Sequence, residues 1–234
     1  MPKIIGILGG VSPESTAEYY LHITRTYTQR FGDYGYPEII IYSVRFQTYV
    51  DWGKEERWDD VARGLSDGAR ILERSGAGCI VIAANTMHIV WKQVQASVEV
   101  PVLSLLDVVA DSILTQGLQV VGLLGTRFTM EKPFYREALG EAGIEVLVPG
   151  PADRDLIHRV IYDELVAGQI LEASKDRYVA IIGKLVERGA QGVILGCTEI
   201  PLLVHDEHVG VPLFNTTTLH AGAALDYALE EDAS

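Results

Sequence analysis

The chain has 234 residues, of which 48% are hydrophobic and 22% are charged, a balance that is typical of a globular protein with a sizeable core. Its formal net charge of −13 argues against non-specific nucleic-acid binding, which needs a basic surface. No apolar run approaches the roughly 18 residues that a membrane-spanning helix requires, so the composition favours a protein that does not cross the membrane.

Short apolar runs alternate with longer amphipathic segments along the chain. The runs are rich in Ile, Val and Leu and nearly unbroken, as strands buried on both faces of a parallel sheet should be; they cover residues 3–8, 38–43, 79–83, 120–124, 145–148 and 193–195. Segments with helical spacing occupy 60–75, 153–167 and 172–188, and each is followed by a glycine that predicts a C-terminal cap. The alternation predicts an α/β protein with doubly wound parallel sheets.

The start of the chain reads as a strand followed by a helix. Its apolar run is short and lacks a small-residue cleavage site, which favours a first strand over a signal peptide. Ser12, Pro13 and Glu14 then give an N-cap, a proline at the first helical position and an acid in the first turn. The two cysteines, Cys79 within a strand pattern and Cys197 at a strand end, form no disulfide framework, so we expect a reducing, cytoplasmic location.

The sequence also repeats itself. The strand–turn segment at 5–10 resembles 121–126, and the segment at 82–86 resembles 195–199 at a nearly equal separation. Chance similarity between glycine-rich turns is the alternative, but two turn pairs that agree in spacing favour two similar lobes. We expect residues 1–115 plus 212–234 in the first lobe and 116–211 in the second, with a linker near 115–117.

The turns of this repeat are the predicted ligand site. Ligands of such sheets bind beyond the carboxyl ends of the strands, so two facing lobes would place all four turns around one crevice. The tail, with a short strand at 211–214 and a helix at 219–229, is expected to return to the first lobe.

Cys197 is the leading candidate for a catalytic residue. It follows a buried strand pattern at a position where the next helix is expected to begin, and a helix N-terminus stabilises a thiolate. Thr198 can cap that helix or hold a substrate carboxylate. The alternative is that Cys197 is a small packing residue.

The symmetry-related turn of the first lobe carries Asn85, Thr86 and His88. Asn85 and Thr86 offer donors and backbone N–H groups at a helix start, which suits a carboxylate ligand. His88 is either an acid/base group or only a polar residue of that helix.

The glycine turn after the first strand lacks the G-x-G-x-x-G spacing of a dinucleotide site, so we expect no nicotinamide cofactor. Gly10 and Ser12 suit a carboxylate better, and Thr126 and Thr129 are their counterparts in the second half. Arg45 could supply positive charge or be a solvated surface residue. The six histidines are scattered, and the pair at 205 and 208 has no third ligand at a useful spacing, so we expect no metal.

At these residues the chain resembles the aspartate/glutamate racemase superfamily over nearly its whole length. The resemblance rests on the motifs at 6–10, 85–88, 124–126 and 196–199, and the forms at 85–88 and 125–127 look most like the branch that acts on L-aspartate and L-glutamate. It implies two pseudo-symmetric Rossmann-like lobes, each a mainly parallel sheet flanked by helices, with the site in the cleft between them. It also implies no cofactor, a dicarboxylate amino acid as substrate, and a homodimer.

One position departs from the family pattern. Two-base members carry a cysteine before Asn-Thr and another before Thr-Glu, each serving one face of the α-carbon, whereas this chain has Ala84 at the first position. Some members of the L-specific branch carry threonine there. We therefore expect a racemase of acidic amino acids that uses Cys197 on one face and Thr86, His88 or water on the other. A single-cysteine decarboxylase or isomerase of another carboxylate, or a carboxylate-binding protein without turnover, are the alternatives.

Overall fold

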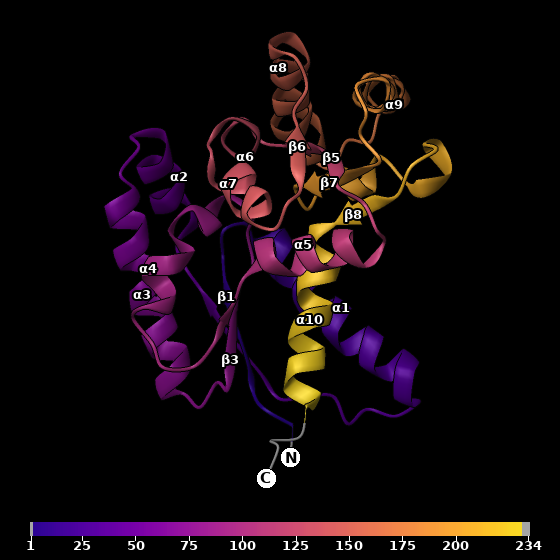
Figure 1. The fold of residues 1–234 in the computed structure, drawn as a ribbon. Coiled ribbons are helices and arrows are strands. Elements are labelled where there is room, and N and C mark those ends of the chain that lie inside the picture. Colours follow the sequence, from indigo (N-terminus) through magenta and orange to yellow (C-terminus); the bar gives the residue numbers. More distant parts are fainter. Residues whose placement is uncertain (1, 231–234) are drawn as a thin grey trace. The chain divides into compact units, whose positions relative to one another are not determined.

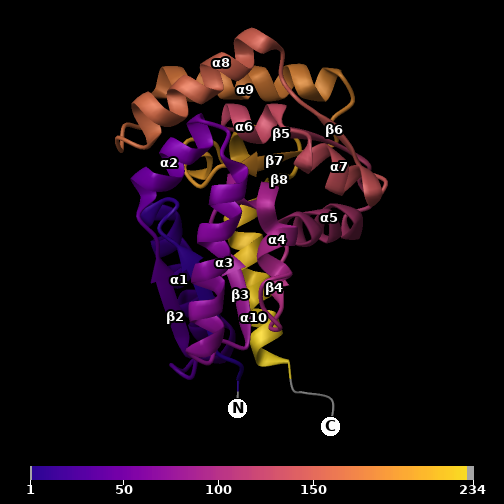
Figure 2. The same ribbon diagram turned by 90° about the vertical axis from the view of Figure 1, so that its left-hand side faces the viewer.

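The chain forms two compact α/β units, which a computed structural model describes for residues 2–230 (Figures 1 and 2). The first unit is discontinuous, because it takes in the chain up to Val108 and again from Thr217 onward; the second is the continuous segment Val109–Thr216. No helix in this described part of the chain is long and apolar enough to cross a membrane.

The first unit is built on a parallel sheet with the strand order β2-β1-β3-β4. Its strands are β1 (Ile5–Gly9), β2 (Ile39–Ser43), β3 (Cys79–Ile82) and β4 (Val102–Leu103). Every residue of β1 and β3 is buried, because helices cover both faces of the sheet. The first three strands match the prediction, whereas β4 was not predicted, since a two-residue strand shows no periodicity.

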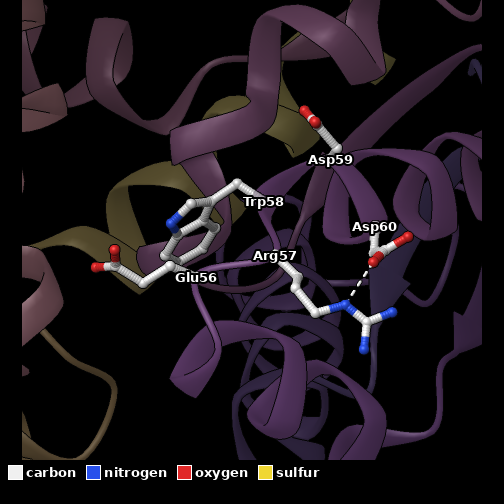
Figure 3. A pocket seen from close by; sticks show the side chains of 5 residues that line it. All are labelled: Glu56, Arg57, Trp58, Asp59 and Asp60. Atoms are coloured by element: carbon white, nitrogen blue, oxygen red, sulfur yellow. Dashed lines mark hydrogen bonds and ion pairs between the residues drawn. The ribbon is translucent and has the colours of Figure 1, made fainter.

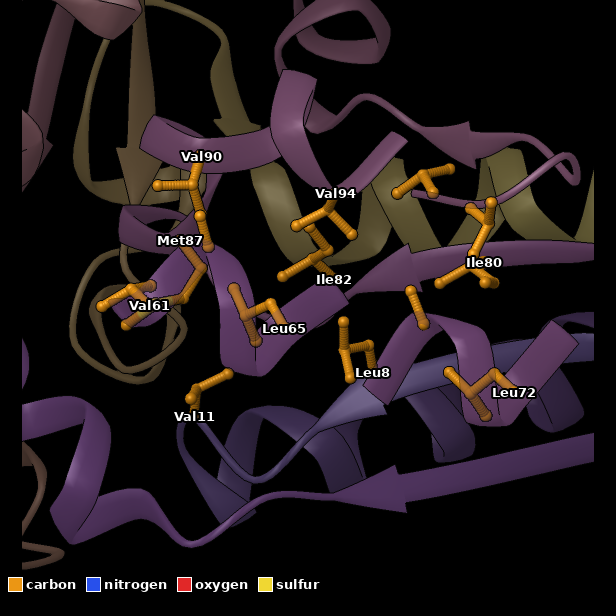
Figure 4. Packing of buried hydrophobic residues seen from close by; sticks show 14 of the residues in the cluster. Leu8, Val11, Val61, Leu65, Leu72, Ile80, Ile82, Met87, Val90 and Val94 are labelled. Carbon is orange, nitrogen blue, oxygen red and sulfur yellow. The ribbon is translucent and has the colours of Figure 1, made fainter. Parts of the chain in front are cut away.

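Two hydrophobic cores lie on the two faces of this sheet. On one face, Leu8 and Ile82 pack against Leu65 and Leu72 of α3 (Figure 4). On the other face, Ile7 packs with residues of α1 and α10. The helices and helical turns of this unit are α1 (Pro13–Phe31), α2 (Phe46–Lys54), α3 (Trp58–Arg74), η1 (Thr86–Val90), α4 (Trp91–Gln95) and α10 (Thr216–Leu229), and α5 (Leu105–Thr115) crosses the boundary between the units.

The second unit repeats the plan with the order β6-β5-β7-β8, again all parallel. Its strands are β5 (Val120–Gly125), β6 (Glu145–Leu147), β7 (Gly192–Gly196) and β8 (Leu213–Asn215). Its helical elements are α6 (Arg127–Glu131), α7 (Phe134–Glu141), α8 (Pro151–Arg159), the π-helix η2 (Val160–Leu165), α9 (Glu172–Glu187), η3 (Ile200–Leu202) and η4 (Asp206–His208). The equal strand orders confirm the predicted pair of similar α/β lobes.

Strand register brings the candidate turns to one edge of each sheet. In the first sheet Gly9 lies opposite Ser43, and Leu8 lies opposite Ile82, so the chain leaves all three strands at the carboxyl edge. In the second sheet Gly125 lies opposite Gly196 in the same way. The residues that follow these strands are therefore neighbours within their own unit.

The predicted helix caps are confirmed where their geometry can be read. Ser12 is extended and its side chain accepts a hydrogen bond from Ser15 N–H, as an N-cap does. Gly76, Gly168 and Gly189, which follow the three predicted helices, all have positive φ angles of 73–104°. Glycine reaches this left-handed region without the penalty that a side chain brings.

Three features differ from the sequence prediction. The compact units divide at Val108 and Thr216, because α5 begins within the first unit and β8 pairs with β7, whereas the tail strand was predicted in the first lobe. The predicted helix at 153–167 is α8 followed by a wider π-helical turn, in which Val166 N–H bonds to Ile161 O. No α-helix follows Cys197, where only the three-residue η3 begins at Ile200.

Candidate active site

The turn after β1 is tightly packed and uses most of its polar groups internally. Gly10 has φ +86°, and a Cβ there would lie 2.5 Å from Val44 N and O, so this position excludes any side chain. Gly10 N–H donates to Thr16 Oγ1 at 2.8 Å, and Ser12 Oγ accepts from Ser15 N–H at 3.3 Å. The amide of Gly10 is thus engaged, while the hydroxyl hydrogen of Ser12 can still donate to a ligand.

The segment after β3, residues 83–86, is called here the Ala84 turn. Ser15 Oγ donates to Ala83 O at 2.7 Å, and Ala84 N–H donates to Ile82 O at 2.8 Å. Asn85 is buried and Thr86 is half-buried at the start of η1. Ala84 is half-buried beside the core and carries no proton to exchange, so the face that it presents is apolar.

His88 lies directly behind the Ala84 turn and is 3% exposed. Its Nδ1 lies 2.8 Å from Ala84 O, and its Nε2 lies 3.2 Å from Leu105 N. Burial lowers the pKa of His88 to about 4. Because both ring nitrogens bind backbone groups and the ring stays neutral, the geometry argues against the acid/base role that the sequence allowed for this residue.

Arg45 follows β2 and occupies the N-cap position of α2 without a side-chain capping bond. Its side chain is exposed, so a cation is available at the carboxyl edge of the first sheet. This position fits either reading of the sequence, a charge for a carboxylate ligand or a solvated arginine.

In the second unit the two threonines after β5 have different environments. Thr126 caps α6, accepting from Thr129 N–H at 3.4 Å. Thr129 is 0% exposed, and a Cβ on Gly125 would lie 2.9 Å from its methyl group. Thr126 is therefore accessible to a ligand, whereas Thr129 is buried and packs beneath the strand end.

Cys197, Thr198 and Glu199 follow β7 and form what is called here the Cys197 turn. The thiol of Cys197 donates to Glu199 Oε2 at 2.9 Å, and the hydroxyl of Thr198 donates to the same oxygen at 2.8 Å. Glu199 is 8% exposed, and Cys197 is half-buried. The Cys197 thiol is thus hydrogen-bonded directly to the buried carboxylate of Glu199.

The protonation state of Cys197 differs from the sequence expectation. Burial raises its pKa well above the usual value, and the negative charge of Glu199 and the hydrogen bond to it raise it further. Hydrogen bonds from the backbone of Glu199 and Thr198 lower the pKa of Cys197, but burial and Glu199 outweigh them, and only the 3₁₀ turn η3 follows in place of the expected α-helix. Cys197 is therefore a thiol, and the acceptor of its hydrogen bond is Glu199.

Sequence reasoning assigned no role to two residues of this unit. Glu199 was part of the recognised motif, and its spacing of two residues from the cysteine was the available signal. Tyr162 in η2 was missed altogether; burial, Cys197 and Glu199 raise its pKa, which indicates that its hydroxyl lies in their field. Its ring packs on His158, with the ring centroids 4.8 Å apart.

A surface hollow of about 380 Å³ lies elsewhere, between α2 and α3, and is lined by residues 56–60 (Figure 3). The Arg57 guanidinium binds Asp60 at 2.6 Å and Glu55 at 3.0 Å, so its charge is already compensated. None of the candidate residues lines this hollow. Within residues 2–230, no group of three or more His, Cys, Asp or Glu side chains is arranged to hold a metal ion.

Comparison with known proteins gives relatives that cover almost the whole chain. A candidate Asp/Glu racemase from Yersinia pestis is 44% identical with a TM-score of 0.93, over 97% of this chain and all of the other. An aspartate racemase homologue from Pyrococcus horikoshii is 41% identical with a TM-score of 0.89, over the same shares.

A curated relative is less similar and matches over a shorter stretch. The broad specificity amino-acid racemase RacX of Bacillus subtilis is 29% identical over 147 residues, which is 62% of this chain and 63% of RacX. The sequence profile of the family described as Asp/Glu/Hydantoin racemase matches residues 8–224. The resemblance inferred from the motifs is thereby confirmed, and the chain belongs to the Asp/Glu/Hydantoin racemase family.

Proposed function

We propose that this protein is a cofactor-independent racemase of acidic amino acids, aspartate or glutamate, with Cys197 as its central catalytic residue. The observation that carries the proposal is the Cys197 turn, in which a thiol donates directly to a buried carboxylate. Membership of a racemase family and the similarity to an aspartate racemase homologue support the choice of reaction and substrate.

The reaction begins with a proton transfer within the Cys197 turn. Glu199 accepts the thiol proton, and the resulting thiolate of Cys197 removes the proton from the substrate α-carbon, which regenerates the thiol and leaves a carbanion. The α-proton of an amino acid is a very weak acid, so the carbanion needs fixed donors around its carboxylate. We assign this role to the turns of both units, through Ser12, Arg45, Asn85, Thr86, Thr126 and Thr198.

Inversion requires a proton on the opposite face of the carbanion. In this proposal that proton comes from Thr86 or from a water molecule beside Ala84, since the methyl group of Ala84 has none to give. After turnover Glu199 gives its proton to solvent, and solvent reprotonates Thr86 or replaces the water, so no net proton is consumed. A weak donor on one face and a thiol on the other should make Cα exchange strongly unequal between the two enantiomers, because only one of them presents its α-proton to Cys197, whereas kcat/KM for inversion is the same in both directions.

A lyase is the second candidate function, because a single thiol that is protonated at rest suits a reaction that delivers only one proton. In that case Cys197 would protonate a carbanion left by loss of CO2, and the resulting thiolate would be reprotonated from solvent while Glu199 stays a carboxylate. The apolar Ala84 and the raised pKa of Cys197 are the observations that favour this candidate.

Deuterium exchange at Cα tests the proposal directly. Purified protein is incubated in D2O with each enantiomer of aspartate and of glutamate, and exchange, inversion and substrate loss are followed by NMR. The racemase exchanges and inverts the substrate, with Cα exchange faster from one enantiomer than from the other. Loss of substrate with release of CO2 would support the lyase, and a protein that binds without any exchange would contradict both.

The assembly and location of the protein are further parts of the proposal. We propose a homodimer, as the family resemblance implies, and a reducing, cytoplasmic location, which keeps the free Cys79 and Cys197 reduced. Light scattering of the purified protein checks the first, and thiol titration with and without a reducing agent shows whether activity depends on a reduced Cys197.

A further inference from the structure

Two buried imidazoles connect the Ala84 turn to the rest of the first unit. His88 is 3% exposed and His220, on α10, is 0% exposed. Their rings meet edge to face with centroids 5.5 Å apart. Neither ring has a part in the proposed proton transfers, so their burial needs another explanation.

Each ring is fixed in one neutral tautomer by its partners. A carbonyl oxygen can only accept and an amide N–H can only donate, so His88 carries its hydrogen on Nδ1, toward Ala84 O, and accepts from Leu105 N–H through Nε2. His220 Nε2 lies 2.9 Å from Leu103 O and must donate to it, which leaves Nδ1 to accept from the Tyr19 hydroxyl at 2.8 Å. The two tautomers are therefore opposite.

The bonds of these rings join segments that are far apart in the sequence. Leu103 and Leu105, on either side of Ser104, bind one imidazole each. Ser104 Oγ accepts from Asp107 N–H at 3.2 Å at the start of α5. Through the two rings the Ala84 turn, the β4–α5 connection, α10 and α1 are held in one network.

The groups that face the two rings keep the network neutral. They are Tyr19, the backbone groups and the other imidazole, and no carboxylate contributes a shift to either ring. Burial lowers the pKa of His220 to about 3, and that of His88 to about 4. A protonated His88 would point an N–H at the N–H of Leu105, so the network opens when it is charged.

We propose that His88, His220 and Tyr19 are positioning residues, which fix the backbone of the Ala84 turn for catalysis without exchanging protons with the substrate. The proposal rests on the proposed function for its effect on turnover. The decisive bond is that from His88 Nδ1 to Ala84 O, because it orients the peptide group between Ala84 and Asn85 and thereby the donors of Asn85 and Thr86.

Two substitutions by amide side chains test the two hydrogen bonds of His88 one at a time. The side-chain amide of His88→Asn can place an N–H near the position of Nδ1 and keep the bond to Ala84 O. His88→Gln can place its oxygen near Nε2, which keeps the bond from Leu105 N–H but loses that to Ala84. We expect kcat to fall at least about tenfold in His88→Gln and to stay within about threefold of wild type in His88→Asn, since small misplacements of a site are costly.

The outcomes distinguish positioning from other roles. Equal and large losses in both variants would overturn the proposal in favour of an acid/base role, and unchanged kcat in both would reduce His88 to a packing residue. Ile23→Val, a core truncation in the same unit, shows what a comparable drop in Tm does to kcat by itself. If His88→Gln does not fold, Tyr19→Phe serves instead, with a fall in kcat of about threefold to tenfold relative to wild type and an unchanged KM expected; an unchanged kcat would overturn the proposal.

A spectroscopic readout keeps this test separate from the proposed function. In wild type, 15N NMR of the imidazoles should show His88 as the Nδ1–H tautomer and His220 as the Nε2–H tautomer, both unchanged from pH 8 to about pH 5. Titration of either ring near pH 6.5, or the reverse tautomers, would overturn the network. If wild type shows no Cα exchange, the proposed function fails, and the Kd for aspartate of the two His88 variants then decides whether the turn is positioned.

Discussion

The Ala84 turn and the Cys197 turn hold equivalent places in two sheets of the same strand order, yet they are built from different chemistry. The Ala84 turn is fixed by neutral donors, Ser15 and His88, and presents no titratable group. The Cys197 turn contains a thiol that donates a hydrogen bond to a buried carboxylate. A duplicated fold thus supplies two similar backbone frames, and under the proposed function the side chains on them would make one turn reactive and the other a support.

The strongest test of this asymmetry is removal of the thiol. We expect Cys197→Ser to lower Cα exchange by about 10²–10⁴-fold, the usual contribution of a general acid/base group. Cys79→Ser is the matched control, because Cys79 lies inside β3 with its pKa raised to about 12 and cannot serve as a base. It should keep kcat and lose about 1–2 kcal/mol of unfolding free energy by burying a hydroxyl. Equal losses of activity in two folded variants would contradict the assignment.

Removal of the carboxylate tests whether the reactive turn acts as a pair. Glu199→Gln keeps a hydrogen-bond acceptor for the thiol but cannot take up its proton, so we expect exchange to fall by about 10²-fold near pH 7. Because the negative charge of Glu199 raises the pKa of Cys197, that pKa should fall in the variant. Activity should therefore recover partly at alkaline pH, and a pH profile of kcat parallel to that of wild type would show that Glu199 is not the base.

Giving the supporting turn a thiol should make the two turns more alike. Ala84→Cys adds a proton donor at the position that lacks one, so we expect kcat/KM for inversion to gain about tenfold, equally in both directions because the equilibrium constant between enantiomers is one. The excess of Cα deuterium exchange over inversion, which is expected for the enantiomer whose α-proton faces Cys197, should shrink. Exchange and inversion followed from both enantiomers measure this, and Ala84→Ser, a hydroxyl with a far higher pKa, is the control. An unchanged ratio of exchange to inversion would argue against a role of this position on the second face.

A separate test of the supporting turn concerns stability in acid. His88 and His220 have folded-state pKa values of about 4 and about 3, below the roughly 6.5 of an unfolded chain, so only the unfolded state takes up protons as the pH falls from 6.5 to about 4. The contribution of the two neutral histidines to the unfolding free energy should be fully present above pH 6.5. Below that pH it should decline by about 1.4 kcal/mol per pH unit for each histidine. His220→Gln, which can still donate to Leu103 O, should remove one of the two contributions in urea titrations.

Local patterns in the sequence were enough to predict most of the fold. The unbroken apolar runs of β1, β3 and β7 mark buried parallel strands, and Ser12 and Gly76 mark helix ends through backbone needs that only their own residue types meet. Strand β4 was not predicted, because its two residues are defined by their pairing with β3 and show no periodicity in the sequence.

The sequence named candidate residues for the site, but it could not predict their electrostatics. Cys197 and Asn85 follow from the repeated motif, whereas the thiol state of Cys197 depends on burial and on the rotamer of Glu199, which no spacing encodes. The neutral state of His88 depends on its burial, to which His220, from a distant part of the chain, contributes by packing against its ring. Contacts of high sequence separation decide these properties, and a linear pattern does not contain them.

The discontinuity of the first unit has a consequence for biosynthesis. The second unit is one uninterrupted segment, whereas the first unit is complete only when α10 has been synthesised, because its Ala221, Ala224 and Leu225 cover β1 and β3. At common translation rates of about 5–20 residues per second, synthesis of the intervening segment lasts on the order of ten seconds. Until it ends, the apolar face of β1 lacks this cover and the Ala84 turn lacks His220. A chain truncated before α10 should therefore leave that face available to chaperones.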